Sequence, residues 1–171
     1  MHGSTAPAPS VPPLARDQWE KHPNYPRQVL LLGSHEGFRG FSERLIEAAA
    51  AGRSVSEISR LYHYWMGAMR GHEGYEERKL YPFLERRFGV QTASMRAGHG
   101  ALHDKQHDVE QRLLRVPERA ELDFEDARTD LVTGLRAYDG TLRAHLELEE
   151  DLVIPALLAL SPQEFRQYYA S

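Results

Sequence analysis

The sequence predicts an all-α protein: an antiparallel (up-down) four-helix bundle with a flexible N-terminal arm and a short C-terminal helix. Four long stretches place apolar residues three or four positions apart, which is the period of an amphipathic helix. No segment shows the strict alternation of polar and apolar residues that is typical of a half-buried strand. Short loops with capping residues join the four stretches, and such connections favour antiparallel packing.

The composition is that of an ordinary soluble domain. A chain of 171 residues with 41% hydrophobic and 27% charged residues suits one domain with one core. No apolar run is long enough for a transmembrane helix, and no basic segment leads into an apolar one, so we expect no membrane partner and a cytoplasmic location. The net charge of -4 without a basic run gives no reason to expect nucleic acid as a partner. Because the chain has no cysteine, any bound metal must use nitrogen and oxygen ligands.

Residues 1–26 are predicted to form a proline-rich arm. They contain six of the ten prolines and too few apolar residues to order themselves by burial. Trp19 and Tyr25 could still attach the end of the arm to the domain. The bundle domain then covers residues 27–171.

Capping signals delimit the first two helices. The first runs from about residue 27 to 51, and Gly52 ends it. Ser54 and Glu57 form a capping box that begins the second helix, and Gly89 ends that helix.

The third helix is predicted over residues 92–116 and stops at Pro117. Asp123 caps the fourth. A second capping box, Ser161 to Glu164, begins the short C-terminal helix, which runs to about Tyr169.

One template occurs twice in the chain. A histidine is followed by Glu at +4, Glu at +5, Pro at +10 and Leu at +12, first from His72 and again from His145. Each proline should bend or end its helix. A spacing of four places the histidine and the first glutamate on one helix face, as His72/Glu76 and His145/Glu149. Both pairs fall on the inward stripe, whereas Glu150 is about 100° further round and is predicted to face outward.

Other histidines share the inward stripes. On the first helix His35 points inward, and on the third His99 and His103 are centred on the apolar face, whereas His107 lies at its edge. His63 is expected to be solvated. A single inward histidine is more often a hydrogen-bonded core residue than a ligand. Five histidines and two carboxylates at one level of a bundle cannot satisfy one another without buried charges, so together they predict a metal site.

These motifs resemble the hemerythrin-like, or HHE cation-binding, family over about residues 28–158. The shared pattern is one His on the first helix, His-x-x-x-Glu on the second and fourth, and His-x-x-x-His on the third. The resemblance implies two metal ions with this ligand set: His35 and His72 on one iron, His99, His103 and His145 on the other, and Glu76 and Glu149 as bridges. Oxygen-carrying hemerythrins have an Asp at +5 on the last helix, so Glu149 and Glu150 are both candidates for that bridge.

The donor types agree with this ligand set. Imidazole and carboxylate suit iron, manganese or zinc but not copper(I). Five neutral imidazoles and two carboxylates around two divalent ions leave about two positive charges, so a bridging oxide or hydroxide is expected. The Glu-x-x-His motif of ferritin-like oxidases is missing. An iron with only two histidines keeps a position for a small molecule, enclosed by four side chains: Trp65, Met69, Leu102 and Tyr138.

We therefore expect a non-heme di-iron protein that binds or senses dioxygen, nitric oxide or peroxide. One alternative is a peroxidase- or catalase-like enzyme in which Tyr138 or Tyr62 supplies an electron or proton. Others are an iron-binding or storage protein and a metal-free scaffold.

Two glycine stripes have identical spacing and face away from the ligands: Gly33, Gly37 and Gly40, and Gly67, Gly71 and Gly74. Each glycine costs a helix roughly 0.5–1 kcal/mol, and close packing is the usual compensation. The partner would be the arm, through Trp19, or a second copy in a homodimer. Alternatively, the glycines only loosen the helices.

Overall fold

The computed structural model of the protein describes residue 11 and residues 14–27, 29–116 and 124–170. These residues are mostly helical and contain no strand, which confirms the all-α fold class. The elements, in chain order, are α1 (Arg16–Trp19), the 3₁₀ turn η1 (Tyr25–Arg27), α2 (Val29–Ala50), α3 (Val55–Tyr75), the π-helical turn η2 (Glu76–Leu80), α4 (Tyr81–Phe88), α5 (Ala93–Arg115), α6 (Phe124–Leu158) and α7 (Pro162–Ala170).

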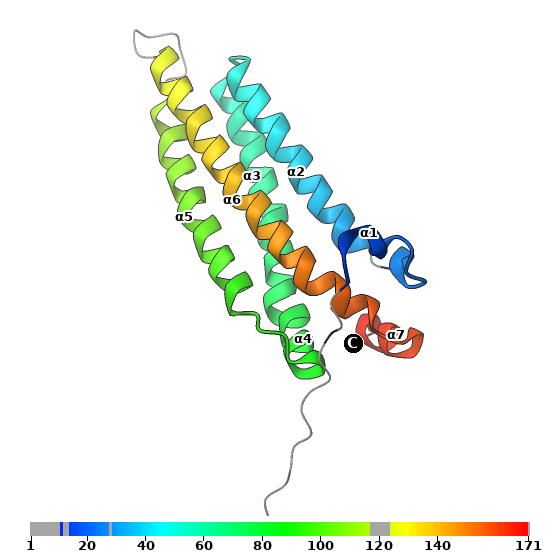
Figure 1. The fold of residues 1–171 in the computed structure, drawn as a ribbon. Coiled ribbons are helices and arrows are strands. Elements are labelled where there is room, and N and C mark those ends of the chain that lie inside the picture. The colour runs from blue at the N-terminus through cyan, green and yellow to red at the C-terminus, as the bar shows by residue number, and fades with distance from the viewer. Residues whose placement is uncertain (1–10, 12–13, 28, 117–123, 171) are drawn as a thin grey trace, which may run out of the picture.

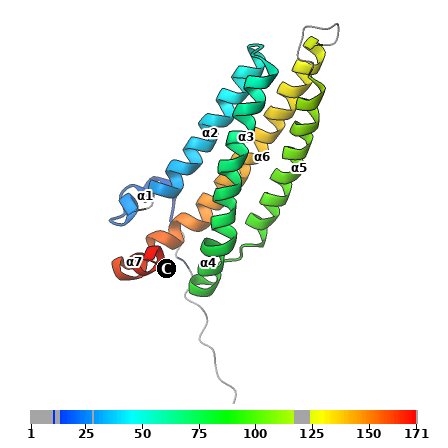
Figure 2. The same cartoon turned by 180° about the vertical axis from the view of Figure 1, so that it is seen from behind.

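Four long helices form the bundle, as Figures 1 and 2 show from opposite sides. Helix α5 packs along α6, α6 along α2, α2 on α3, and α3 on α5, so the four close into a ring. The turn η2 and helix α4 continue α3 at one end of the bundle. Helices α1 and α7 lie toward that same end (Figure 1).

The core consists of two apolar clusters with a polar layer between them. On α2, His35 lies between Leu31 of one cluster and Phe38 of the other. A histidine is likewise flanked by the two clusters in two further segments, Met69–Leu80 and Met95–Leu102. On α6, Glu149 and Glu150 lie between Leu146 of one cluster and Val153 of the other, and His145 lies next to Leu146. The predicted metal ligands are thus spaced along their helices so that most of them meet at one level.

Part of the predicted arm packs on the bundle. Trp19 is only 6% exposed and belongs to the same cluster as Leu31. Arg16 forms ion pairs with Glu150 and Asp151 of α6. The end of the arm therefore packs on the domain, because Trp19 buries its large apolar side chain there. Residues 1–10 and 12–13 of the predicted arm lie outside the described residues.

The glycine stripes face open space. A Cβ atom placed at five of the six glycines would meet nothing within 4 Å: Gly33, Gly37, Gly40, Gly67 and Gly71. Trp19 therefore does not cover them, and the idea that it plugs the stripes is wrong for the described residues. The homodimer stays a prediction.

The structure confirms Ser54 as an N-cap, the capping box of Ser161 and Glu164, and Gly89 as a C-terminal cap. Ser54 Oγ accepts a hydrogen bond from the backbone N–H of Glu57, at 3.3 Å. Ser161 and Glu164 exchange backbone-to-side-chain hydrogen bonds at 2.9 and 3.3 Å. Gly89 ends α4 with a φ of 67°, a left-handed conformation that glycine adopts without strain.

The two prolines act differently. A π-helical turn precedes Pro82, and the backbone N–H of Tyr81 donates to Glu76 at its end. Pro82 then lies in the first turn of α4, where a missing N–H is tolerated. Pro155 lies inside α6, which ends at Leu158. The predicted breakpoints Pro117 and Asp123 lie outside the described residues.

Candidate metal centre

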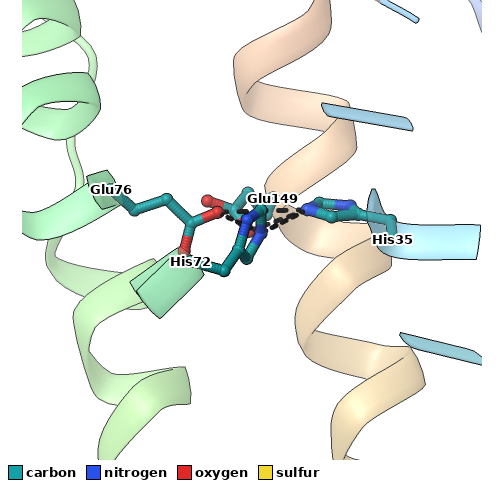
Figure 3. Close-up of side chains that lie close together, drawn as sticks. All are labelled: His35, His72, Glu76 and Glu149. Carbon is teal, nitrogen blue, oxygen red and sulfur yellow. Dashed lines mark hydrogen bonds and ion pairs between the residues drawn. The ribbon is translucent and has the colours of Figure 1, made fainter. Parts of the chain in front are cut away.

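Four side chains from four elements point toward one another, as Figure 3 shows. They are His35 of α2, His72 of α3, Glu76 of η2 and Glu149 of α6, each offering a ligand atom within 4.8 Å of the others. The Nε2 atom of His35 lies 3.1 Å from Nε2 of His72 and 3.6 Å from Oε2 of Glu149. This group could hold one metal ion.

A second group shares Glu76 with the first and adds His99 of α5 and His145 of α6. Glu76 Oε1 lies 2.6 Å from His72 Nε2, whereas its Oε2 lies 3.3 Å from His99 Nε2. Glu149 Oε2 is 3.7 Å from His145 Nε2 and also faces the first group. Both carboxylates therefore lie where they can bridge two cations.

The unsatisfied atoms of these residues fit a cation. Glu76 and Glu149 are 0% exposed, yet both oxygens of Glu76 and Oε2 of Glu149 have no hydrogen-bond partner among the described residues. The groups that approach these oxygens are imidazole nitrogens, such as Nε2 of His72 at 2.6 Å and Nε2 of His99 at 3.3 Å from Glu76. Two carboxylates buried this close together are costly, and a metal ion would satisfy their oxygens and the imidazole nitrogens together. The donor set of nitrogen and oxygen suits iron, manganese or zinc.

Burial and neighbouring charges shift the pKa values of these residues in different directions. Burial would raise the pKa of Glu76, but His35 and the neighbouring imidazoles outweigh it and lower that pKa. Burial and the negative charge of Glu76 raise the pKa of Glu149. Burial, with a smaller effect of His99, lowers the pKa of His145 to about 4. His145 is therefore neutral at physiological pH, the form that binds metals.

Glu150 contacts the ring nitrogen of His35 that faces away from Glu76. It is 3% exposed, and its Oε1 lies 3.0 Å from His35 Nδ1 and accepts a hydrogen bond from Arg39 Nη2 at 2.8 Å. Burial opposes ionisation, but His35 and Arg39 outweigh it and lower the pKa of Glu150 to about 2. The prediction that Glu150 faces outward is wrong, because α6 packs on α2 as well as on α5 and so has a second buried sector.

Two further side chains support the second group. Glu77 Oε1 lies 2.9 Å from His99 Nδ1. The hydroxyl of Tyr81 donates to Glu149 Oε1 at 2.8 Å, and its ring stacks on His99. Metal-bound histidines commonly use their second nitrogen for such a partner. The sequence interpretation missed Tyr81, since the second copy of the template has Ile154 at the same place and so gave no signal.

His103 does not lie with the other predicted ligands. Its side chain is 58% exposed, and its Nε2 lies 2.8 Å from Glu73 Oε1. The neighbouring residue on α5, Leu102, is buried instead, with 4% of its surface exposed. The structure therefore brings two imidazoles to each group. His63 and His107 are exposed, which confirms their predicted position off the central stripe.

The family model named Hemerythrin HHE cation binding domain matches residues 29–157. The chain belongs to the hemerythrin HHE cation-binding family. This confirms the resemblance drawn from the histidine and glutamate motifs. Comparisons with curated proteins and with solved structures gave no match. Among the helices that the structure describes, none combines the length and hydrophobicity needed to cross a membrane.

One side of this HHE centre is tightly packed. Three of the predicted wall residues, Met69, Leu102 and Tyr138, line a space of only about 10 Å³ beside the second group. Trp65 packs edge-on against Tyr138, with ring centroids 5.1 Å apart. About one water molecule is the most that such a space holds.

Proposed function

We propose that this HHE protein holds two iron ions and binds or senses dioxygen or a related small molecule, nitric oxide or peroxide. The observation that carries the proposal is the pair of ligand groups that share Glu76, with Glu149 of the first group 3.7 Å from His145 of the second. Bound iron would supply reversible redox chemistry and open coordination positions. Two carboxylates and four neutral imidazoles leave about two positive charges on two divalent ions, which favours a bridging oxide or hydroxide.

The protein's own residues hold and orient the ligands. Glu150 and Glu77 position the rings of His35 and His99 through the nitrogens that face away from Glu76. Burial and the charge of Glu149 raise the pKa of Tyr81 above its ordinary value, so its hydroxyl keeps the proton it donates. The space beside the second group is only about 10 Å³, so close packing there leaves little room for bulk water.

Metal analysis after anaerobic iron loading tests the proposal. We expect about two iron ions per chain and a visible band that appears reversibly with dioxygen or nitric oxide. Glu76→Ala should abolish the two-metal centre, because Glu76 belongs to both groups. The matched control Glu47→Ala changes an exposed glutamate of α2 and should bind iron normally. An iron content of about one per chain or less in the unaltered protein would reject the dinuclear assignment.

Tyr81 favours a second candidate, a peroxidase- or catalase-like enzyme. The hydroxyl of Tyr81 donates to Glu149, a candidate ligand. The hydroxyl of Tyr62 instead donates to the carbonyl of Gln106 at 3.1 Å, and Tyr138 packs on Trp65. An enzyme would consume many equivalents of peroxide per chain and slow down in Tyr81→Phe. A binding protein would consume about one equivalent at most.

A further inference from the structure

A pocket of about 190 Å³ lies beside the metal centre, where α2, α3 and η2 meet α7 and the end of α6. Its walls are mostly apolar and come from segments far apart in the sequence. They include Leu31, Leu80, Leu157, Tyr75, Tyr169 and His72. Of the six candidate metal ligands, His72 lines this pocket, so holding a metal does not by itself explain why an apolar space lies here.

His72 connects the pocket to the centre. Its side chain is 12% exposed, whereas those of the other five residues in the two groups are at most 6% exposed. The Nε2 atom of His72 points at Glu76 and His35, and the ring also borders the pocket. A molecule in the pocket would therefore lie against one candidate metal ligand.

The lining indicates the chemistry of the molecule. Among the residues that the structure describes, no Asp, Glu, Lys or Arg side chain borders the pocket, so a neutral ligand fits it best. Three leucines and two tyrosine rings suit an apolar body, and the polar residues His72 and Ser34 suit a polar end. An apolar cavity of about 150 Å³ is large enough to bind benzene. This pocket therefore has room for more than a diatomic gas.

We propose that the pocket binds an organic hydroperoxide, with its apolar group against the leucines and its peroxide end at His72. The proposal rests on the function proposed above, because it names the class of peroxide that reaches that centre. It concerns binding alone and requires no bond to form or break.

The outer wall of the pocket belongs to α7, which carries Tyr169. The hydroxyls of Tyr168 and Tyr75 are hydrogen-bonded to each other. The centroids of the Tyr168 and Phe83 rings are 4.5 Å apart. Arg87 of α4 also binds Glu164 of α7, at 2.9 Å. Because α7 is anchored at several points, Tyr169, which is 41% exposed, can be truncated without disturbing the metal ligands.

Binding to the zinc-loaded protein, followed by ligand-observed NMR, tests the proposal without redox chemistry. The probe is 2-phenylpropan-2-ol, the unreactive alcohol that matches cumene hydroperoxide. We expect one molecule per chain with millimolar affinity, as its small size allows. Leu31→Phe should weaken binding about tenfold or more by filling the pocket. Tyr169→Ala removes a wall and should weaken binding as well, and it provides the test if Leu31→Phe does not fold.

Two controls decide where the probe binds and which charge it needs. Leu148→Phe enlarges a leucine in the open groove between α5 and α6, which also borders His145, and should leave binding unchanged. The anion 2-methyl-2-phenylpropanoate should bind much more weakly than the alcohol. Absence of binding, binding that survives both pocket variants, sensitivity to Leu148→Phe instead, or equal binding of the anion would each overturn the proposal. Failure of the iron form to bind dioxygen, nitric oxide or peroxide would instead reject the proposed function and leave the zinc result standing.

Discussion

Replacing Gly98 with alanine should damage the half of the metal centre that contains His145. A Cβ atom at residue 98 would lie 2.3 Å from His145 Nδ1 and 3.2 Å from both Cγ and Cε1. Because Cγ is the atom that joins the ring to the side chain, the whole imidazole must shift and not only its tip. We expect Gly98→Ala to lose the metal ion of the second group and to keep that of the first.

Two opposing effects set the stability of the metal-free variant. Alanine in a helix is favoured over glycine by about 0.5–1 kcal/mol, and overpacking a buried side chain costs about 1–3 kcal/mol. Gly100 provides a matched control, since a Cβ there would meet nothing within 4 Å on the same helix. The free energy of unfolding of Gly98→Ala should therefore lie about 1–3 kcal/mol below that of Gly100→Ala.

Urea unfolding of the chelated proteins, followed by circular dichroism, measures this difference, and elemental analysis gives the metal content. Gly100→Ala should be at least as stable as the unaltered protein and bind metal normally. If Gly98→Ala matches Gly100→Ala in both stability and metal content, the imidazole of His145 is not held against Gly98, and the geometry of the second group is wrong.

Three further predictions concern the ligands and their partners. His99→Ala should lose metal while His103→Ala retains it, as measured by elemental analysis; the reverse result would contradict the position of α5. Glu149→Ala should abolish the two-metal centre, whereas Glu150→Ala should weaken metal affinity roughly 10–100-fold in competition titrations with a chelator; equal loss in both would make Glu150 a ligand. Burial alone would lower the pKa of His35, but Glu150 and neighbouring carboxylates raise it from 6.5 to about 9. The stabilisation that this proton brings to the metal-free protein is complete below pH 6.5 and is lost as the pH rises toward 9. Metal affinity should rise over the same pH range, because the metal must displace the proton. Calorimetry and metal titrations at several pH values test this, and a free energy of unfolding and a metal affinity that change with pH in the same direction would contradict it.

Local spacing predicted the fold and most of the centre. The pairs His72/Glu76 and His145/Glu149 share a helix face because residues four apart are neighbours on any α-helix. Both glutamates are fully buried, and both histidines lie in the groups that could hold a metal ion. Capping at Ser54 and Ser161 was equally predictable, since a cap depends on a few adjacent residues.

Helix rotation and packing decided the residues that the sequence interpretation misplaced. A count of 100° per residue gives the angle between Glu149 and Glu150, but it does not show that α6 is covered on both sides by α2 and α5. Likewise, the spacing of His99 and His103 does not tell whether His103 faces the core or the solvent. The packing of Leu102 into the core decides this and leaves His103 exposed.

The sequence by itself determined the helices, the inward histidine–glutamate pairs and the family, because these depend on contacts within a turn or two of one helix. The tertiary structure decided how four helices meet at one level. It placed Glu150 behind His35 and Tyr81 beside Glu149, and it left a pocket at His72, since each of these contacts joins segments far apart in the chain. No spacing along a single helix specifies which side chain of another helix it will meet.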